Sequence, residues 1–166
     1  MLSRRLTRPS SYALCAAALG AAAALPASTG AATCRATPSE GVNGNYIAGA
    51  PIRASIGRGH LLSGVVRTAR GCRPIRGARI ELFQAGPDGQ YSTPGKGSWP
   101  YRATVVTRRD GTWSIRGPYP TGAGGVTPHV HLHVTAAGHA PLDTTYFPRA
   151  GEKRGRLVLV LAPRRV

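Results

Sequence analysis

From about residue 60 onward, apolar and polar residues alternate along short segments, which is the period of half-buried β-strands. Seven segments carry this alternation or a short apolar run: residues 61–66, 78–83, 103–107, 112–115, 129–135, 143–147 and 156–161. Turn sequences separate them, most clearly Asp110-Gly111, which is typical of a tight hairpin. Short strands at regular spacing with Gly- and Pro-rich turns predict an all-β fold, specifically a β-sandwich.

The first 32 residues follow a different pattern. Three arginines among the first eight residues precede an almost entirely apolar run, residues 12–25, and small residues come after it. This order is that of a secretory signal peptide, which we assign to residues 1–32. Its start, Ser3-Arg4-Arg5-Leu6, resembles a twin-arginine signal. The apolar run is shorter than the roughly 20 residues of a membrane-spanning helix, so we predict a secreted protein with no membrane span.

The rest of the chain divides into two parts. Residues 33–59 have no strand pattern and contain several Gly and Pro, so we expect an irregular segment there. Residues 60–166 contain all seven predicted strands and form the expected sandwich. A mature chain of about 135 residues is long enough to bury one such core.

The chain is strongly basic, with a net charge of +16 over 166 residues. Nucleic acid, an anionic surface and an anionic substrate are all partners of basic proteins. The arginines are scattered through the strands, and no basic run is interleaved with aromatic residues, so we predict no nucleic-acid partner. Only six acidic residues are present, which argues against hydrolysis by paired carboxylates.

Three cysteines are present, and Cys15 falls within the predicted signal peptide. Cys34 and Cys72 remain as an even pair in an oxidising compartment, which predicts a disulfide between them. An alternative is lipid modification of Cys34 at the mature N-terminus, although the preceding residues lack the usual Leu.

The segment around residues 129–134 is the most informative for chemistry. Alternate residues of a strand share a face, so His129, His131 and His133 point the same way. Two imidazoles at this spacing are well placed to bind one metal ion. The alternative interpretation is a solvent-exposed row of histidines on an edge strand.

Two tyrosines could complete such a site. Tyr91 lies in the loop after the second predicted strand, and Tyr119 lies between two prolines shortly before the histidine strand. The prolines fix the backbone around Tyr119, so that its side chain can be aimed. Taken singly, loop tyrosines are more often amphipathic surface residues.

Together these segments resemble the intradiol ring-cleavage dioxygenases, the catechol and protocatechuate group, over about residues 41–147. The matching motifs, in chain order, are Gly64-Val65-Val66, Pro74-Ile75-Arg76-Gly77-Ala78, Gly89-Gln90-Tyr91, Asp110-Gly111, Pro118-Tyr119-Pro120, His129-Val130-His131 and Tyr146-Phe147. The resemblance implies a β-sandwich in which loops and one strand hold the metal.

By this resemblance, the metal is non-haem Fe(III) and its ligands are Tyr91, Tyr119, His129 and His131. Tyr91 and His129 would stay bound throughout the cycle, whereas the substrate would displace Tyr119, which makes the two tyrosines the catalytic residues. Ferric iron prefers anionic oxygen donors, and a bound cation deprotonates its phenol ligands. His131 and His133 are an alternative pair, although the match at Tyr146-Phe147 favours His129 and His131.

The function implied is that of a secreted Fe(III)-dependent intradiol dioxygenase. Such an enzyme cleaves catecholic rings with O₂ to muconate-type diacids, so the implied partners are a catechol and O₂. The catechol would bind as a dianion, and the displaced Tyr119 could accept one of its protons.

The sequence also departs from the family's pattern at supporting positions. Val126 stands where an Arg is usual, Phe83 where a Trp is usual, and Thr144-Thr145 where a Gln is usual. Arg102 or Arg116 could supply the missing positive charge. Lost supporting partners typically cost roughly 10–100-fold in activity or metal affinity.

Two other functions fit parts of the sequence. One is a binding module without catalysis, similar to transthyretin-like or carboxypeptidase-regulatory-like sandwiches. The other is a Zn or Cu protein that uses His129, His131 and His133. Metal analysis and a Tyr119 variant would separate these functions from the first.

Overall fold

A computed structural model of the chain describes residues 32–95, 98–122 and 125–165. The predicted signal peptide, except for Ala32, lies outside the described residues. Within them there is no helix that could cross a membrane. The strands are β1 (His60–Thr68), β2 (Arg79–Phe83), β3 (Arg102–Val106), β4 (Thr112–Gly117), β5 (Val130–Thr135), β6 (Leu142–Tyr146) and β7 (Arg154–Leu161). Each predicted strand corresponds to one of them, with bounds that differ by a few residues.

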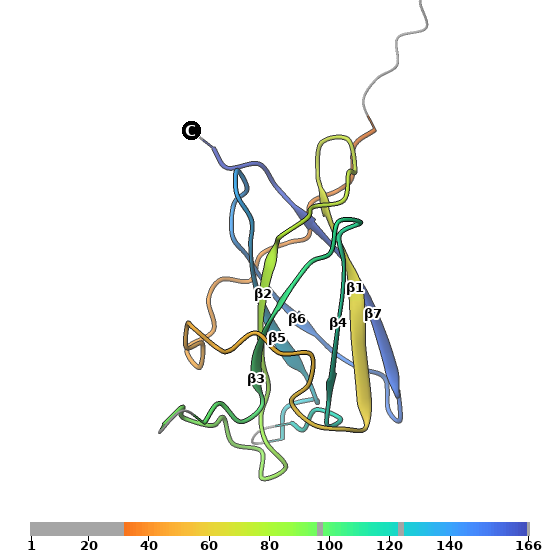
Figure 1. Ribbon diagram of the computed structural model, residues 1–166. Coiled ribbons are helices and arrows are strands. Elements are labelled where there is room, and N and C mark those ends of the chain that lie inside the picture. Colours follow the sequence, from red (N-terminus) through yellow and green to blue (C-terminus); the bar gives the residue numbers. More distant parts are fainter. Residues whose placement is uncertain (1–31, 96–97, 123–124, 166) are drawn as a thin grey trace, which may run out of the picture. The chain divides into compact units, whose positions relative to one another are not determined.

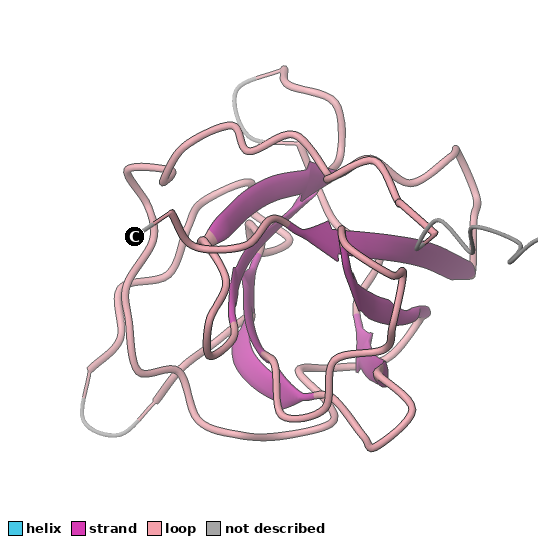
Figure 2. Cartoon of the chain, turned by 90° about the horizontal axis from the view of Figure 1, so that it is seen from above, coloured by secondary structure: helices cyan, strands magenta, loops and turns pink. Residues whose placement is uncertain are grey.

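The strands form two sheets, which Figures 1 and 2 show around a common interior. One sheet has the order β4-β1-β7, in which β1 is antiparallel to β4 and parallel to β7. The other has the order β3-β2-β5-β6 and is antiparallel throughout. The prediction of an all-β sandwich is therefore confirmed.

The core lies between the sheets and follows from the alternation of side chains along each strand. In β5, Val130, Leu132 and Val134 are buried, and they share one cluster with Leu62 and Leu159 of the opposite sheet. Burying such side chains contributes about 1.5–3 kcal/mol each. Because this face of β5 is occupied by the core, the histidines at the intervening positions lie on the outer face of the four-stranded sheet.

Residues 33–59 form no named strand among the described residues, but their backbone bonds to both sheets. The Thr37 amide donates to the Val160 carbonyl at 3.0 Å, and the Glu40 amide donates to the Asp143 carbonyl at 2.8 Å. Further along, the Gly49 amide donates to the Glu81 carboxylate at 2.9 Å. This segment therefore passes over the outer face of β5 and β6, where the histidines lie.

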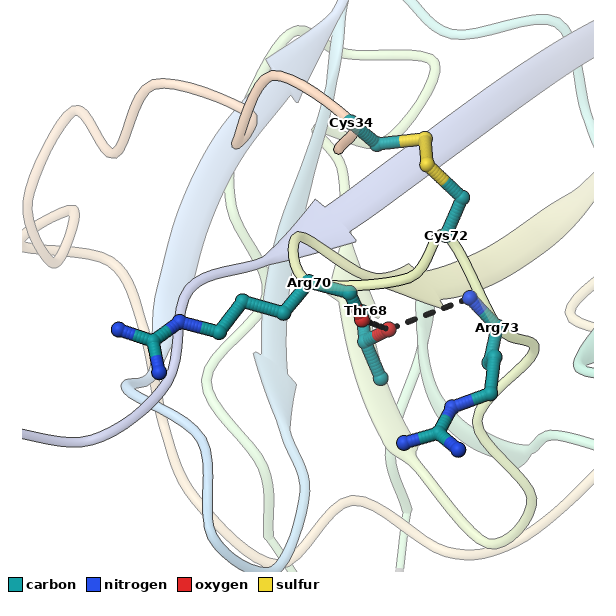
Figure 3. Close-up of a disulfide and its surroundings, with 5 residues drawn as sticks. All are labelled: Cys34, Thr68, Arg70, Cys72 and Arg73. Carbon is teal, nitrogen blue, oxygen red and sulfur yellow. Dashed lines mark hydrogen bonds between the residues drawn. A yellow bond between two sulfur atoms is a disulfide. The ribbon is translucent and has the colours of Figure 1, made fainter. Parts of the chain in front are cut away.

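A disulfide between Cys34 and Cys72 fixes the start of this segment to the loop between β1 and β2 (Figure 3). The loop is itself held by Thr68, whose hydroxyl donates to the Arg70 carbonyl at 2.5 Å and accepts from the Arg73 amide at 3.2 Å. The two cysteines are 38 residues apart in sequence. Closing a loop of that length raises the free energy of unfolding by about 4 kcal/mol in the chain-entropy account.

Candidate metal centre

Strand register brings three side chains of the site into one row across the outer face of the four-stranded sheet. His131 pairs with Phe83 of β2 on one side and with Thr145 of β6 on the other. The Phe83 ring stacks on the His131 ring at 4.9 Å between centroids. Directly opposed residues on one face of a sheet are close enough to contact each other. The His131 ring is thus held on both sides by its strand neighbours.

Three donor atoms converge at His131, the middle residue of this row. Tyr91, from the loop after β2, places its hydroxyl oxygen 2.7 Å from His129 Nε2 and 3.1 Å from His131 Nε2. The two Nε2 atoms are 3.1 Å apart. One phenol oxygen and two imidazole nitrogens therefore form a triangle with sides of about equal length.

Hydrogen bonds on the far side of each ring determine which nitrogen carries the proton. His129 Nδ1 lies 2.8 Å from the Thr127 carbonyl oxygen, which can only accept, so Nδ1 carries the hydrogen. His131 Nδ1 lies 3.2 Å from the Thr145 hydroxyl, which itself donates to the Glu40 carboxylate at 2.7 Å. His131 Nδ1 must then donate as well. Both Nε2 atoms are left with free lone pairs that face Tyr91.

This arrangement fits a bound cation better than it fits hydrogen bonding alone. The two Nε2 lone pairs share only the phenol proton of Tyr91, so one nitrogen stays without a donor. Ligands at right angles around one ion, at metal–nitrogen distances of about 2.1 Å, lie about 3.0 Å apart. The spacing of the three donors matches that value. Ring orientation by hydrogen bonds at Nδ1 is also usual for histidines that ligate metals.

Burial favours the neutral forms of two of these donors, His131 and Tyr91. Burial, and secondly the nearby His129, lower the pKa of His131 to about 4. Burial raises the pKa of Tyr91, while the charge of Arg102 acts in the opposite direction. A metal ligand must be deprotonated at its donor atom, which His131 already is at neutral pH and Tyr91 becomes on contact with a cation.

Arg102 is the buried cation behind the site. It is 2% exposed, its guanidinium lies 5.2 Å from the centre of the Phe83 ring, and its Nε donates to the Ser92 carbonyl at 3.1 Å. Its charge favours the phenolate form of Tyr91. Of the two arginines that the sequence suggested as a substitute charge, Arg102 acts on Tyr91, whereas Arg116 lies on β4 in the other sheet.

A cavity of about 360 Å³ opens in front of the three donors. Besides them, it is lined by two amides, one hydroxyl and two apolar side chains: Asn43, Asn45, Thr145, Val126 and Phe147. Val126 and Phe147 are each 55% exposed, although both are apolar. Ligand cavities commonly start at about 300 Å³, so this space suits a small aromatic molecule.

Of the four residues implied as metal ligands, the structure brings together Tyr91, His129 and His131. Tyr119 has a different partner, because its hydroxyl donates to the Arg149 carbonyl at 3.0 Å. His133, from the alternative pair, points along the same face but its Nδ1 lies 2.7 Å from the Asp143 carboxylate. Among the described residues, no group of three or more His, Cys, Asp or Glu side chains is placed to hold a metal ion.

Two supporting contacts could not be found in the sequence. Glu40 lies in the irregular segment, 105 residues before the Thr145 hydroxyl that it accepts from. The Thr127 carbonyl belongs to the backbone, so no residue type marks it in the sequence. Of the residues in these contacts, only Thr145 stands out in the sequence, because it lies in a segment where the family usually has a Gln.

No family model matches the chain. It is 30% identical to a catechol 1,2-dioxygenase of Pseudomonas sp. (strain EST1001), over 60% of this chain and 42% of that protein. The resemblance to the intradiol ring-cleavage dioxygenases is confirmed. The chain spans less than half the length of this curated relative.

Solved structures of intradiol dioxygenases share the fold. The dioxygenase domain of a dioxygenase and carbohydrate-binding protein fusion from Streptomyces sp. SirexAA-E has a TM-score of 0.68 at 22% identity, covering 78% of this chain and 100% of that chain. An intradiol ring-cleavage dioxygenase from Tetranychus urticae has a TM-score of 0.66 at 20% identity, covering 78% of this chain and 96% of that chain. At these identities the likeness shows the intradiol dioxygenase fold alone.

Proposed function

We propose that the chain is a secreted intradiol dioxygenase, which uses non-haem Fe(III) to cleave a catecholic ring with O₂ and give a muconate-type diacid. The observation that carries the proposal is the triangle of Tyr91 Oη, His129 Nε2 and His131 Nε2, with sides of 2.7–3.1 Å. Sequence similarity to a catechol 1,2-dioxygenase supports the substrate class. The predicted signal peptide and the Cys34–Cys72 disulfide support secretion.

In this proposal, the chain's own residues hold the ion and orient the substrate. Tyr91 gives up its phenol proton to the solvent and becomes an anionic ligand, while Thr127 and Thr145 keep the Nδ1 protons of the two histidines in place. A ferric ion bound there would act as a Lewis acid and as a template for the catecholate. The apolar rim, Val126 and Phe147, would pack against the ring of the substrate.

Tyr119 as the fourth ligand stays a prediction. To reach the ion, its side chain would have to exchange the hydrogen bond with the Arg149 carbonyl for the metal. A tyrosine that alternates between these two positions would suit the role implied for it, because a displaced phenolate can take a proton from the incoming catechol.

The test is the visible spectrum and O₂ uptake of protein purified with iron. Tyrosinate bound to ferric iron absorbs strongly in the visible, so we expect a red-brown protein with one iron per chain that consumes O₂ when catechol is added. Tyr91→Phe should weaken the colour strongly and lower the iron affinity at least tenfold, as expected for the loss of a charged ligand. Tyr101→Phe, a tyrosine with no part in the site, is the matched control.

Other outcomes separate the alternatives. A colourless protein without stoichiometric metal would support a binding module instead. Stoichiometric zinc or copper that survives Tyr91→Phe would point to a histidine site. For Tyr119→Phe, we expect iron to stay bound and the absorption band to weaken and shift. An unchanged spectrum would remove Tyr119 from the ligand set and leave a site with three protein donors.

A further inference from the structure

A second cavity, of about 390 Å³, lies on the sheet that does not carry the metal centre. Its lining includes four cationic side chains, Arg58, Arg116, Lys153 and Arg154, and no acidic one. The metal-centre cavity is lined by a different set of residues, so the two cavities share no side chain.

Strand register explains why these cations gather. Leu61 of β1 pairs with Arg116 of β4 on one side and with Arg154 of β7 on the other. Leu61 lies between the buried positions His60 and Leu62, so this row is on the outer face of the sheet. The two arginines are then separated by two strand spacings, about 9.6 Å at the backbone. Arginine side chains are long enough to converge from that distance on one ion.

Two further cations come from the segments that lead into β1 and β7. The Lys153 carbonyl accepts the Leu61 amide at 2.9 Å, which places Lys153 beside β1. Arg58 lies in the turn that leads into β1, between Gly57 and Gly59, which both have positive φ angles, +147° and +114°. An L-residue rarely adopts these conformations, so the turn that presents Arg58 depends on glycine.

In the described part of the chain, none of these four cations forms an ion pair with a carboxylate. The strands β1, β4 and β7 contain no Asp or Glu. Among the described residues, the ion pair that the structure forms is His133–Asp143, on the other sheet. The nearest acid in sequence is Glu152, whose carboxylate accepts the Arg149 amide at 2.8 Å and whose charge also acts on His60 of the cavity lining. The four side chains are solvent-exposed, and the repulsion between their like charges, which salt screens in part, favours a bound anion.

We propose that this cavity binds a tetrahedral oxyanion that carries two negative charges, such as sulfate or phosphate, either free or as an ester group. Guanidinium groups bind the oxygens of such anions bidentately, and two or more arginines around one dianion are a common arrangement. A singly charged carboxylate would leave most of the positive charge uncompensated. The proposal is independent of the metal centre.

The test is calorimetric titration of the full chain with sodium sulfate, at constant ionic strength maintained with sodium chloride. We expect saturable binding of one sulfate per chain. The double variant Arg116→Ser/Arg154→Ser should weaken it at least tenfold, a loss on the order of one charged hydrogen bond. The matched control, Arg76→Ser/Arg109→Ser, removes the same charge from exposed loops and should change the affinity less than twofold.

Titrations with inorganic phosphate and with glycerol phosphate distinguish the sources of the anion. Tighter binding of the ester would identify an ester group as the ligand, and tighter binding of either inorganic ion would identify a free anion. No saturable binding of any of the three would overturn the proposal. An equal loss in both double variants would also overturn it, because the effect would then follow net charge and not this cavity.

Discussion

Thr145 lies directly opposite His131 in the antiparallel pair of β5 and β6, and its hydroxyl oxygen is 3.2 Å from His131 Nδ1. The same hydroxyl donates to the Glu40 carboxylate at 2.7 Å. A chain of two hydrogen bonds thus runs from a carboxylate to the ring that offers Nε2 to a metal. A carboxylate at the end of such a chain makes the imidazole a stronger donor.

The first prediction concerns this chain of hydrogen bonds. Thr145→Val keeps the shape of the side chain but removes the hydroxyl, so His131 loses the group that fixes its orientation. We expect iron affinity to fall roughly tenfold, in the range typical of such supporting contacts. Competition with a chelator measures it. Thr144→Val is the control, since Thr144 is the neighbouring residue of β6, and a similar loss there would contradict the explanation.

The second prediction concerns the buried charge of Arg102. Arg102→Met keeps much of the side-chain volume but removes the charge that favours the phenolate of Tyr91. The pKa of Tyr91 in the metal-free protein should therefore rise, which an ultraviolet titration of the phenolate against pH measures. Arg116→Met removes an equal charge from the other sheet. An equal Tyr91 pKa in the two variants would show that Arg102 has no special effect on this phenol.

The third prediction concerns the close approach of β1 to β7. A Cβ atom on Gly64 would lie 2.2 Å from the Leu157 carbonyl oxygen and 3.0 Å from Trp113 Nε1. Gly64→Ala should therefore lower the free energy of unfolding by about 1–3 kcal/mol, the usual cost of overpacking. Urea denaturation measures it. Gly44→Ala is the control, because a Cβ atom there has no heavy atom within 4 Å.

The fourth prediction concerns the pH dependence of stability that His60 causes. His60 is 5% exposed, and its ring stacks on that of Tyr146 at 6.0 Å between centroids, while the Tyr119 ring lies at right angles to it. Burial lowers the pKa of His60, and Glu152 opposes this only in part. Below about pH 6.5 the unfolded chain therefore binds a proton that the folded chain does not. Stability must then fall as the pH falls through this range.

The variant His60→Gln isolates this contribution. Its free energy of unfolding should decline less between pH 7.5 and 5.5 than that of the wild-type chain, both measured without metal. His131, whose pKa is also lowered, is common to the two proteins and cancels in the difference. Parallel pH dependence in the two proteins would rule out His60 as a source.

The fold could be predicted from the sequence because the alternation of apolar and polar residues recurs in strand after strand. Alternation in β5, for example, placed Val130 and Leu132 in the core and the histidines outside, and the structure confirms this. Local patterns of this kind determine a strand and its faces.

The site was less accessible to sequence reasoning, because its supporting contacts join distant segments. Tyr91 and His129 could be matched to a family motif, but the Glu40 carboxylate, in a segment without strand pattern, could not. The hydroxyl of Tyr119 also depends on a backbone partner, the Arg149 carbonyl, which no residue type reveals.

The contact between Glu40 and Thr145 also bears on the order in which the protein matures. It joins positions 105 residues apart, and β5 and β6 must already be paired before Thr145 stands beside His131. Forming so distant a contact is slow relative to pairing a local hairpin. During refolding, full iron affinity should therefore appear last, after the two sheets have assembled. A refolding time course in which full iron affinity preceded β5–β6 pairing would contradict this order.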